Sequence, residues 1–323
     1  MSSIKEKILI MILEPINWFI PMKPAMSMYN ALFESVSTKW VRILNYHVRI
    51  PNKDFIWKIN LYNGESVRTR IEKGIPKSQH FAVGYKWHDP SLSFLEYRIT
   101  EFLLNKNNSC FIDCGANLGL RSLTSLSKGL ATHMIEPNEE LNEINRKRCE
   151  LNGFNNYWIH PVGVSDCDGQ HVFHIDDSSY LSSLEQRDVL SEHIVRSETI
   201  EIRTLDTIFR DQLKLDDFNV FIKIDVENHE EKVLKGGSKL IEKHSPTLLI
   251  EIDDNGNHKG IFRSLMDVGY VVFQTVHDLN VSQNSFLQEI ESENEEYVFK
   301  TKDFLFIKDS EVLNYMRQFV CEN

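Results

Sequence analysis

The sequence predicts an α/β protein with a doubly wound, mostly parallel sheet, and three observations support this fold class. An apolar run at 110–112 ends in Asp113, and the glycines Gly115 and Gly119 then lead into a helical pattern. About twenty residues later a second apolar run, 131–135, also ends in an acid. Short apolar runs then alternate with amphipathic stretches, as they do in repeated strand–helix–strand units. In such sheets, ligands bind beyond the carboxyl ends of the strands.

Seven apolar runs are expected to be the strands of this sheet. They are residues 110–112, 131–135, 157–162, 220–224, 247–250, 271–275 and 304–307.

Helices are expected between these strands, and several carry start or stop signals. Asp89 followed by Pro90 is a helix start, and Asn152 followed by Gly153 is a helix stop. Asn228, with Glu231 three residues later, fits a variant of the capping box. The expected helices are 90–103, 120–126, 137–152, 228–236 and 261–268.

The remaining segments are expected to be irregular or to add short strands. Apolar residues at 172–175 and 200–202 indicate two such strands. The polar stretch 177–197 is expected to be a mobile loop over the site, because binding loops lie at the surface. The acidic stretch 285–296 is expected to be a solvated loop.

The chain before the first sheet strand is expected to form an extension of the main domain. Helical spacing predicts one amphipathic helix over 29–44. Alternating runs on both sides of Asn63-Gly64 predict a β-hairpin. We therefore expect two units, an extension at 1–87 and a domain at 88–323. The extension would serve as a cap, a substrate-side wall or an oligomer surface.

The apolar segment 8–22 is too short to span a bilayer and is interrupted by Glu14, Pro15 and Pro21. Flanking lysines resemble the charged end of a signal peptide, but no small-residue cleavage site follows. A packed N-terminal helix is the first interpretation, and a shallow contact with a membrane surface is the alternative.

The composition indicates which partners the protein can bind and in which cellular compartment it is expected. The net charge of −11 and pI of about 5.6 argue against a broad nucleic-acid surface. The five cysteines show neither zinc spacing nor a disulfide framework, and Cys110 and Cys114 are expected to be small core residues. A reducing cytoplasm fits this pattern, so the predicted location is cytoplasmic or peripheral to a membrane.

The spacing of the glycines indicates which cofactor the turn holds. A dinucleotide fingerprint has glycine at the position of Asn117, so that backbone amides approach a pyrophosphate. Asp113 also projects a carboxylate just before the turn, which would repel a pyrophosphate and attract an ammonium. S-adenosylmethionine carries an ammonium, a sulfonium and a ribose, and it has no phosphate. The sequence therefore predicts S-adenosylmethionine. The alternative is a glycine turn used only for close helix–strand packing.

Seven residues are predicted to bind this cofactor. Glu136 ends the second strand, where an acid can accept hydrogen bonds from both ribose hydroxyls. Ser165 and Asp166, just past the third strand, are placed to meet the adenine or else form a plain turn. The predicted set is Asp113, Gly115, Asn117, Gly119, Glu136, Ser165 and Asp166.

Several segments together resemble the FkbM-type methyltransferase family. They are FIDCGANLG (111–119), IEPN (135–138), VSD (164–166) with Gly169, TLD (204–206), IKIDVENHE (222–230) and LKGG (234–237). The resemblance covers roughly residues 90–275 in order. It implies a class I, S-adenosylmethionine-dependent fold that methylates hydroxyls, often on sugars or polyketides. The family usually has glycine where this chain has Asn228. Asn tolerates positive φ best after Gly, so the turn is expected to survive.

Two residues are predicted to act in catalysis. His229 is the first candidate for the general base, because imidazole titrates near neutral pH. The alternative for His229 is a polar residue in the first turn of a helix. Asp225 is expected to orient the substrate or the cofactor amine, with Glu227 and Glu251 at the same mouth. With Asp253, these acids could also hold magnesium or calcium, but nothing in their spacing requires it, and we expect no metal.

Two other functions remain open from the sequence. An NAD-dependent oxidoreductase would share the fold but lacks its glycine fingerprint here. A non-catalytic module of the same fold would bind the cofactor or a partner protein without turnover. The main prediction is an O-methyltransferase acting on a hydroxyl-bearing small molecule or glycan, without a nucleic-acid partner.

Overall fold

A computed structural model of the chain describes most of the predicted domain and the hairpin. The described residues are 55–61, 65–71, 90–176, 184, 194–210, 219–253, 258–276, 285–290 and 301–321. The expected helices at 8–22 and 29–44, the Asn63-Gly64 turn and Asp89 lie outside them.

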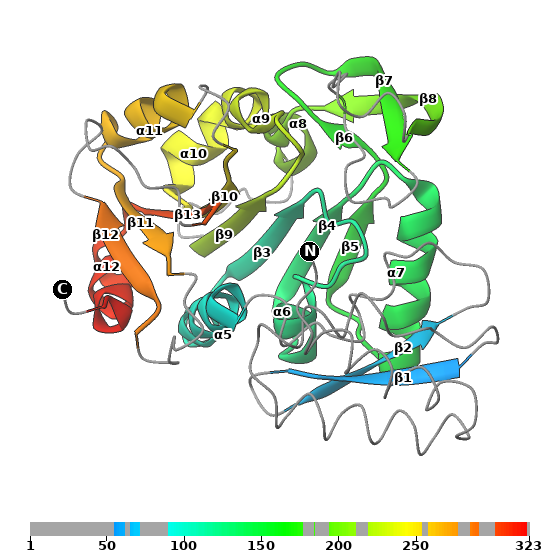
Figure 1. The fold of residues 1–323 in the computed structure, drawn as a ribbon, viewed down its shortest axis with the longest axis horizontal. Coiled ribbons are helices and arrows are strands. Elements are labelled where there is room, and N and C mark those ends of the chain that lie inside the picture. Colours follow the sequence, from blue (N-terminus) through cyan, green and yellow to red (C-terminus); the bar gives the residue numbers. More distant parts are fainter. Residues whose placement is uncertain are drawn as a thin grey trace, which may run out of the picture.

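The main sheet is doubly wound and mostly parallel, as predicted (Figure 1). The five strands from β10 to β5 run parallel, whereas β13 is antiparallel to both of its neighbours and β12 to β11. In spatial order the strands are β12 (Leu287–Ile290), β11 (Val271–Thr275), β13 (Asp303–Ile307), β10 (Thr247–Glu251), β9 (Asn219–Ile224), β3 (Ser109–Cys114), β4 (Ala131–Ile135) and β5 (Tyr157–His160).

The sheet has eight strands, whereas the sequence predicted seven. The additional strand is β12, which lies within the stretch 285–296 that was expected to be a solvated loop. Phe286, Leu287 and Ile290 are buried, and β12 pairs with β11 through Val272 and Ile290. The solvated-loop prediction is wrong for these residues because the surrounding acidic residues obscured a short apolar pattern. Residues 291–300 lie outside the described part.

The strand order places a topological switch point at β3. The chain continues from β3 to β4 and β5 on one side, whereas β9, much later in sequence, pairs with β3 on the other side. At a switch point the loops after neighbouring strands diverge and leave room for a ligand. The predicted glycine turn follows β3 at this point.

Helices cover both faces of the sheet, and α7 ends at Asn152 as predicted, although it begins at Glu139 and not at 137. The Asn138 side chain accepts a hydrogen bond from Glu140 N at 3.0 Å, and Gly153 ends α7 at a φ of 70°. The helices α8, α10 and α12 were not predicted from the sequence. The described helices are α5 (Pro90–Leu104), α6 (Leu123–Ser127), α7 (Glu139–Asn152), α8 (Leu205–Phe209), α9 (Glu230–Gly236), α10 (Ser238–His244), α11 (His258–Met266), α12 (Ser310–Met316) and the 3₁₀ helix η3 (Arg317–Phe319).

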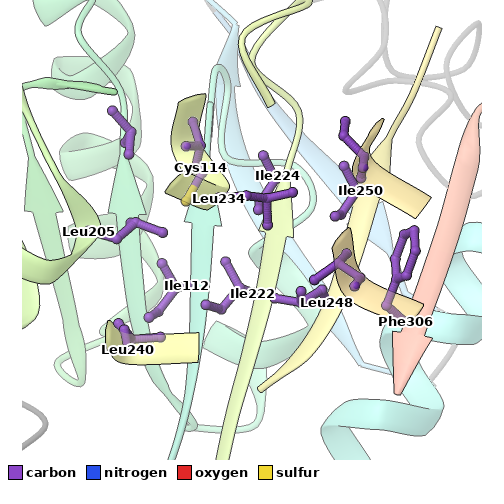
Figure 2. Packing of buried hydrophobic residues seen from close by; sticks show 14 of the residues in the cluster. Ile112, Cys114, Leu205, Ile222, Ile224, Leu234, Leu240, Leu248, Ile250 and Phe306 are labelled. Atoms are coloured by element: carbon purple, nitrogen blue, oxygen red, sulfur yellow. The ribbon is translucent and has the colours of Figure 1, made fainter. Parts of the chain in front are cut away.

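Separate apolar clusters cover the two faces of the sheet. One cluster joins the strands to α8, α9, α10 and α11, and another joins them to α5 and α12. Cys110 and Cys114 are buried in the first cluster, as expected of small core residues. Figure 2 shows side chains of this cluster from three strands and three helices: Ile112, Ile222, Leu248, Leu205, Leu234 and Leu240. Each such side chain stabilises the fold by roughly 1.5–3 kcal/mol when fully buried. The packed strands therefore hold the loops at their carboxyl ends in place.

A second, three-stranded sheet follows β5. Its order is β6 (Gly163–Val164), β8 (Ile194–Arg203) and β7 (Gly169–Asp176). The end of the stretch 177–197 therefore belongs to a strand, so the loop prediction is wrong for residues 194–197. Leu184 is buried against this small sheet. The rest of that stretch lies outside the described residues.

The predicted hairpin consists of β1 (Phe55–Asn60) and β2 (Ser66–Ile71), with Ile59 opposite Val67. Its buried residues share one apolar cluster with Ala116 of the glycine turn and with residues of α6, α7 and β4. Arg68 is hydrogen-bonded to Asn152 at the end of α7. That end points away from the carboxyl ends of the strands (Figure 1). The role of the extension as a cap, a substrate-side wall or an oligomer surface stays a prediction. Division of the chain near residue 87 stays a prediction.

None of the helices in the described ranges is long and apolar enough to cross a membrane.

Candidate active site

The glycine turn after β3 and the loop after β9 meet at the carboxyl edge of the sheet. Asp225 N donates a hydrogen bond to Cys114 O at 3.1 Å. A side chain at Gly115 would place Cβ 1.9 Å from Asp225 O, and Gly115 has a φ of 74°. Only glycine therefore allows the two loops to approach this closely.

Glu136 lies beside this turn and is held by backbone donors. Its two carboxylate oxygens accept hydrogen bonds from Asn117 N and Asn138 N, both at 2.9 Å. Burial, opposed by these hydrogen bonds, raises the pKa of Glu136 to about 7. Because a carboxylate offers about four lone-pair positions, it retains the capacity to accept further hydrogen bonds from a diol.

Asp113 lies beneath the turn and is fully buried. Its carboxylate accepts a hydrogen bond from Ser122 Oγ at 2.7 Å and lies 3.5 Å from Lys223 Nζ. Asp113 therefore contacts protein groups here, and its predicted contact with a ligand ammonium stays a prediction.

Lys223 connects two acids and was not singled out as a site residue from the sequence. Its Nζ lies 3.0 Å from Asp225 Oδ2, and the lysine side chain is 6% exposed. Burial disfavours the ammonium, but the carboxylates of Asp225 and Asp113 outweigh it and raise the pKa of Lys223. A lysine within an otherwise apolar strand was the available signal, because such a charge requires buried partners.

Asp225 and Glu251 form an acidic pair at the ends of β9 and β10. Burial opposes ionisation of Asp225, but the charge of Lys223 and hydrogen bonds from Lys223 and Glu251 hold its pKa below the usual range. The charge of Asp225 and burial raise the pKa of Glu251 to about 10. At neutral pH the pair therefore shares one proton, with Asp225 ionised and Glu251 protonated. The Asp225 side chain is 29% exposed and thus accessible.

The loop after Asp225 has the conformation expected from the sequence. Asn228 has a φ of 74°, which confirms that Asn occupies a left-handed position here. Glu230 Oε1 accepts hydrogen bonds from Val226 N and Asn228 N, at 3.3 and 3.1 Å. The predicted capping box of Asn228 and Glu231 is wrong, because α9 begins after His229, and Glu230 bonds back to the loop.

His229 is buried, with 2% of its surface exposed. Its Nε2 lies 2.9 Å from Ser165 Oγ, so it connects the loop after β9 to the segment after β6. Gly236 packs against the same segment, since a Cβ there would lie 2.1 Å from Ser165 O. The predicted role of His229 as the general base stays a prediction.

Ser165 and Asp166 occupy different environments. Ser165 is 3% exposed, whereas Asp166 forms a 2.7 Å ion pair with Lys235 at the surface. The hydrogen bond from Lys235 lowers the pKa of Asp166. Their predicted contact with adenine stays a prediction.

Further acids surround the mouth of the site. The charges of Asp303 and Glu227 add to the raised pKa of Glu251. Asp253 forms an ion pair with Lys302. Within the described ranges, no group of three or more His, Cys, Asp or Glu side chains is arranged to hold a metal ion.

Comparison with known proteins identifies one family and several distant structures. The model of the methyltransferase FkbM domain matches residues 113–292, which is more than half of the chain. No curated protein matches the chain.

Three solved methyltransferases illustrate the structural likeness. A methyltransferase FkbM from Methylobacillus flagellatus is 18% identical with a TM-score of 0.39, and the match covers 71% of this chain and 54% of that one. A SAM-dependent methyltransferase from Agrobacterium tumefaciens is 8% identical with a TM-score of 0.39, covering 81% and 71%. A T. thermophilus 16S rRNA methyltransferase, solved with AdoMet and guanosine, is 11% identical with a TM-score of 0.40, covering 81% and 52%. This chain thus spans about half the length of the first of these proteins.

Proposed function

Because the chain belongs to the FkbM methyltransferase family, we propose that it transfers a methyl group from S-adenosylmethionine to a hydroxyl oxygen of a small molecule or glycan. The observation that carries this proposal is the pair of carboxylates at the switch point. Glu136 is held in place by two backbone amides, and Lys223 lies 3.0 Å from Asp225 and holds its pKa below the usual range.

The residues present fit this cofactor. Glu136 retains acceptor capacity for the two ribose hydroxyls, and the turn beside it has no glycine at the pyrophosphate-binding position, where Asn117 stands. The three acids Asp113, Glu136 and Asp225 outnumber Lys223, which lies between two of them, and this excess of acids favours a sulfonium and an ammonium. When bound, S-adenosylmethionine would supply an electrophilic methyl carbon.

Asp225 is the proposed proton acceptor for the attacking hydroxyl. Lys223 holds it ionised, and its side chain is partly exposed at the mouth of the site. Glu251 keeps its proton and donates a hydrogen bond to Asp225, which fixes the carboxylate orientation. Alignment of the reacting groups supplies roughly 7–11 kcal/mol, and a base adds about 10²- to 10⁴-fold.

We place this activity in a reducing compartment such as the cytoplasm. Two of the five cysteines, Cys110 and Cys114, lie in the buried strand β3, and all five are free. A cytoplasmic methyltransferase needs no disulfide, so this pattern supports the proposal.

The experiment that tests the acceptor class is a methyl-release assay with labelled S-adenosylmethionine and a panel of hydroxyl-bearing sugars and glycans. We expect label in an alkali-stable methyl ether on one class of acceptor. Label found only on amines, carboxylates or nucleic acid would contradict the hydroxyl acceptor while leaving methyl transfer intact.

His229→Ala is expected to weaken S-adenosylhomocysteine binding about 10-fold, with kcat at saturating cofactor falling by less than about 10-fold. The reason is that His229 contacts Ser165, and loss of one buried hydrogen bond costs about 1–2 kcal/mol. Calorimetry and steady-state kinetics separate these effects. His229→Asn is the matched control, because it keeps a polar group at the start of α9.

If His229 is the general base, as the sequence predicts, the effects on kcat and on cofactor affinity should be reversed. Both His229 variants would then lose kcat by about 10²- to 10⁴-fold with cofactor affinity retained. They would also lose an ascending limb of the pH–rate profile near the imidazole pKa.

A further inference from the structure

Arg148 of α7 is a buried cation whose partners are uncharged oxygens. Only 3% of its surface is exposed, and burial lowers its pKa to about 10. Its guanidinium donates to Thr69 Oγ1 at 3.1 Å, to Asn145 Oδ1 at 3.1 Å and to Leu118 O. Burying a charge is costly, so a side chain used only for packing would not require arginine here.

Two of these contacts act on the glycine turn. Leu118 belongs to the turn, and Asn145 Nδ2 also donates to Asn117 O at 2.8 Å. A Cβ at Gly119 would lie 2.6 Å from Asn145 Oδ1, so the turn packs closely against α7. Arg148 and Asn145 together therefore hold two consecutive carbonyl groups of the turn.

This part of the turn needs external support. Asn117 has a φ of 49°, a left-handed conformation that is unfavourable for residues other than glycine, although least so for Asn. Such conformations persist only when surrounding contacts determine them. The amide of Asn117 in turn donates to Glu136, so the contacts on the turn carbonyls also fix the Glu136 carboxylate.

The third contact of Arg148 reaches the hairpin. Thr69 lies on β2 and is 1% exposed, and its hydroxyl accepts from Arg148 Nε. The hairpin also packs against the turn through the cluster that contains Val67 and Ala116. A continuous path of hydrogen bonds thus runs from Thr69 through Arg148 to the turn and on to Glu136.

We propose that Arg148 is a positioning residue for the cofactor site, and that the hairpin β1–β2 supports cofactor binding through Thr69. The inference rests on the proposed function, because it takes the ligand beside Glu136 to be S-adenosylmethionine. Neither residue contacts the ligand. They hold the turn in the conformation in which Glu136 can accept the ribose hydroxyls.

The test is calorimetric titration of full-length variants with S-adenosylhomocysteine. Arg148→Met is expected to weaken binding about 10- to 100-fold, since it removes charge-assisted hydrogen bonds to the turn. Thr69→Val is expected to weaken binding about 3- to 10-fold, and Thr69→Ser, which keeps the hydroxyl, less than about 2-fold. Arg146→Met is the matched control, because Arg146 lies on the same helix and pairs with Glu139 and Glu143 near the surface. It should bind like the wild type.

Steady-state kinetics distinguish positioning from a general loss of stability. We expect the KM for S-adenosylmethionine to rise in Thr69→Val, with the KM for the acceptor and kcat at saturating cofactor unchanged. A merely structural role would lower the melting temperature and the active fraction without this difference between the two KM values.

Folded Arg148→Met with wild-type affinity would overturn the inference, provided that Glu136→Ala still loses binding. If Arg148→Met fails to fold, the comparison of the two Thr69 variants is the test. Equal affinities of Thr69→Val and Thr69→Ser would then overturn the inference. A wild-type protein that does not bind S-adenosylhomocysteine would instead overturn the proposed cofactor, and this inference with it.

Discussion

Asp225→Asn is expected to lower kcat by about 10²- to 10⁴-fold, because it removes the proposed proton acceptor while keeping the size of the side chain. Lys223 would lose the negative charge of the partner 3.0 Å away and retain Asp113. The pKa of Glu251 should fall, because the charge of Asp225 is the main cause of its rise. Single-turnover measurement of methyl transfer at saturating cofactor gives the effect on chemistry.

The controls separate catalysis from binding. S-adenosylhomocysteine affinity should change by less than about 3-fold in Asp225→Asn, and Asp267→Asn, an exposed acid after α11, should behave as the wild type. The wild-type kcat should also show no ascending limb near pH 6–7, since Lys223 holds the pKa of Asp225 below its usual range. Near wild-type turnover by Asp225→Asn would remove Asp225 from the chemistry and return His229 to first place.

Glu136→Ala is expected to weaken S-adenosylmethionine binding about 10- to 100-fold, because hydrogen bonds to a charged group contribute roughly 1.5–3 kcal/mol. Asn117 and Asn138 would each lose the acceptor of a backbone amide, so part of the effect comes from the turn itself. Calorimetry on the purified variant measures the change, and circular dichroism checks that the fold is retained.

The pH dependence provides an internal control for the role of Glu136. Its pKa of about 7 means that the carboxyl group takes up a proton as the pH falls below 7. The protonated form accepts hydrogen bonds poorly, so wild-type affinity should decrease from pH 8 to pH 6. Glu136→Ala should show no such decrease. Unchanged affinity in this variant, with the wild-type pH dependence retained, would remove Glu136 from the site.

The sequence predicted those parts of the site that depend on local backbone geometry. The strand–turn–helix unit after β3 was predictable because Gly115 and Gly119 lie at positive φ, where other residues are strained. The position of Asn228 was predictable for the same reason. The C-terminus of α7 followed from Asn152 and Gly153, which form a local stop signal.

Contacts between distant segments were not predictable, because no local pattern encodes them. Nothing near Asp113 indicates that Lys223 lies 3.5 Å away, and nothing near Arg148 indicates Thr69. His229 lies in the loop after β9, as expected, but no local pattern indicates its contact with Ser165, 64 residues earlier in the chain. The strand β12 was missed because its short apolar pattern lies among acidic residues, and its pairing with β11 is not encoded locally.

The most direct test of the central proposal is a calorimetric titration of the wild-type protein with S-adenosylhomocysteine, alongside a titration with NAD⁺. We expect saturable one-to-one binding of S-adenosylhomocysteine that Glu136→Ala weakens about 10- to 100-fold, and no saturable binding of NAD⁺. Saturable binding of NAD⁺ without binding of S-adenosylhomocysteine would contradict the proposal and favour an oxidoreductase. Binding of neither ligand would also contradict it, and would leave a methyltransferase fold without its cofactor.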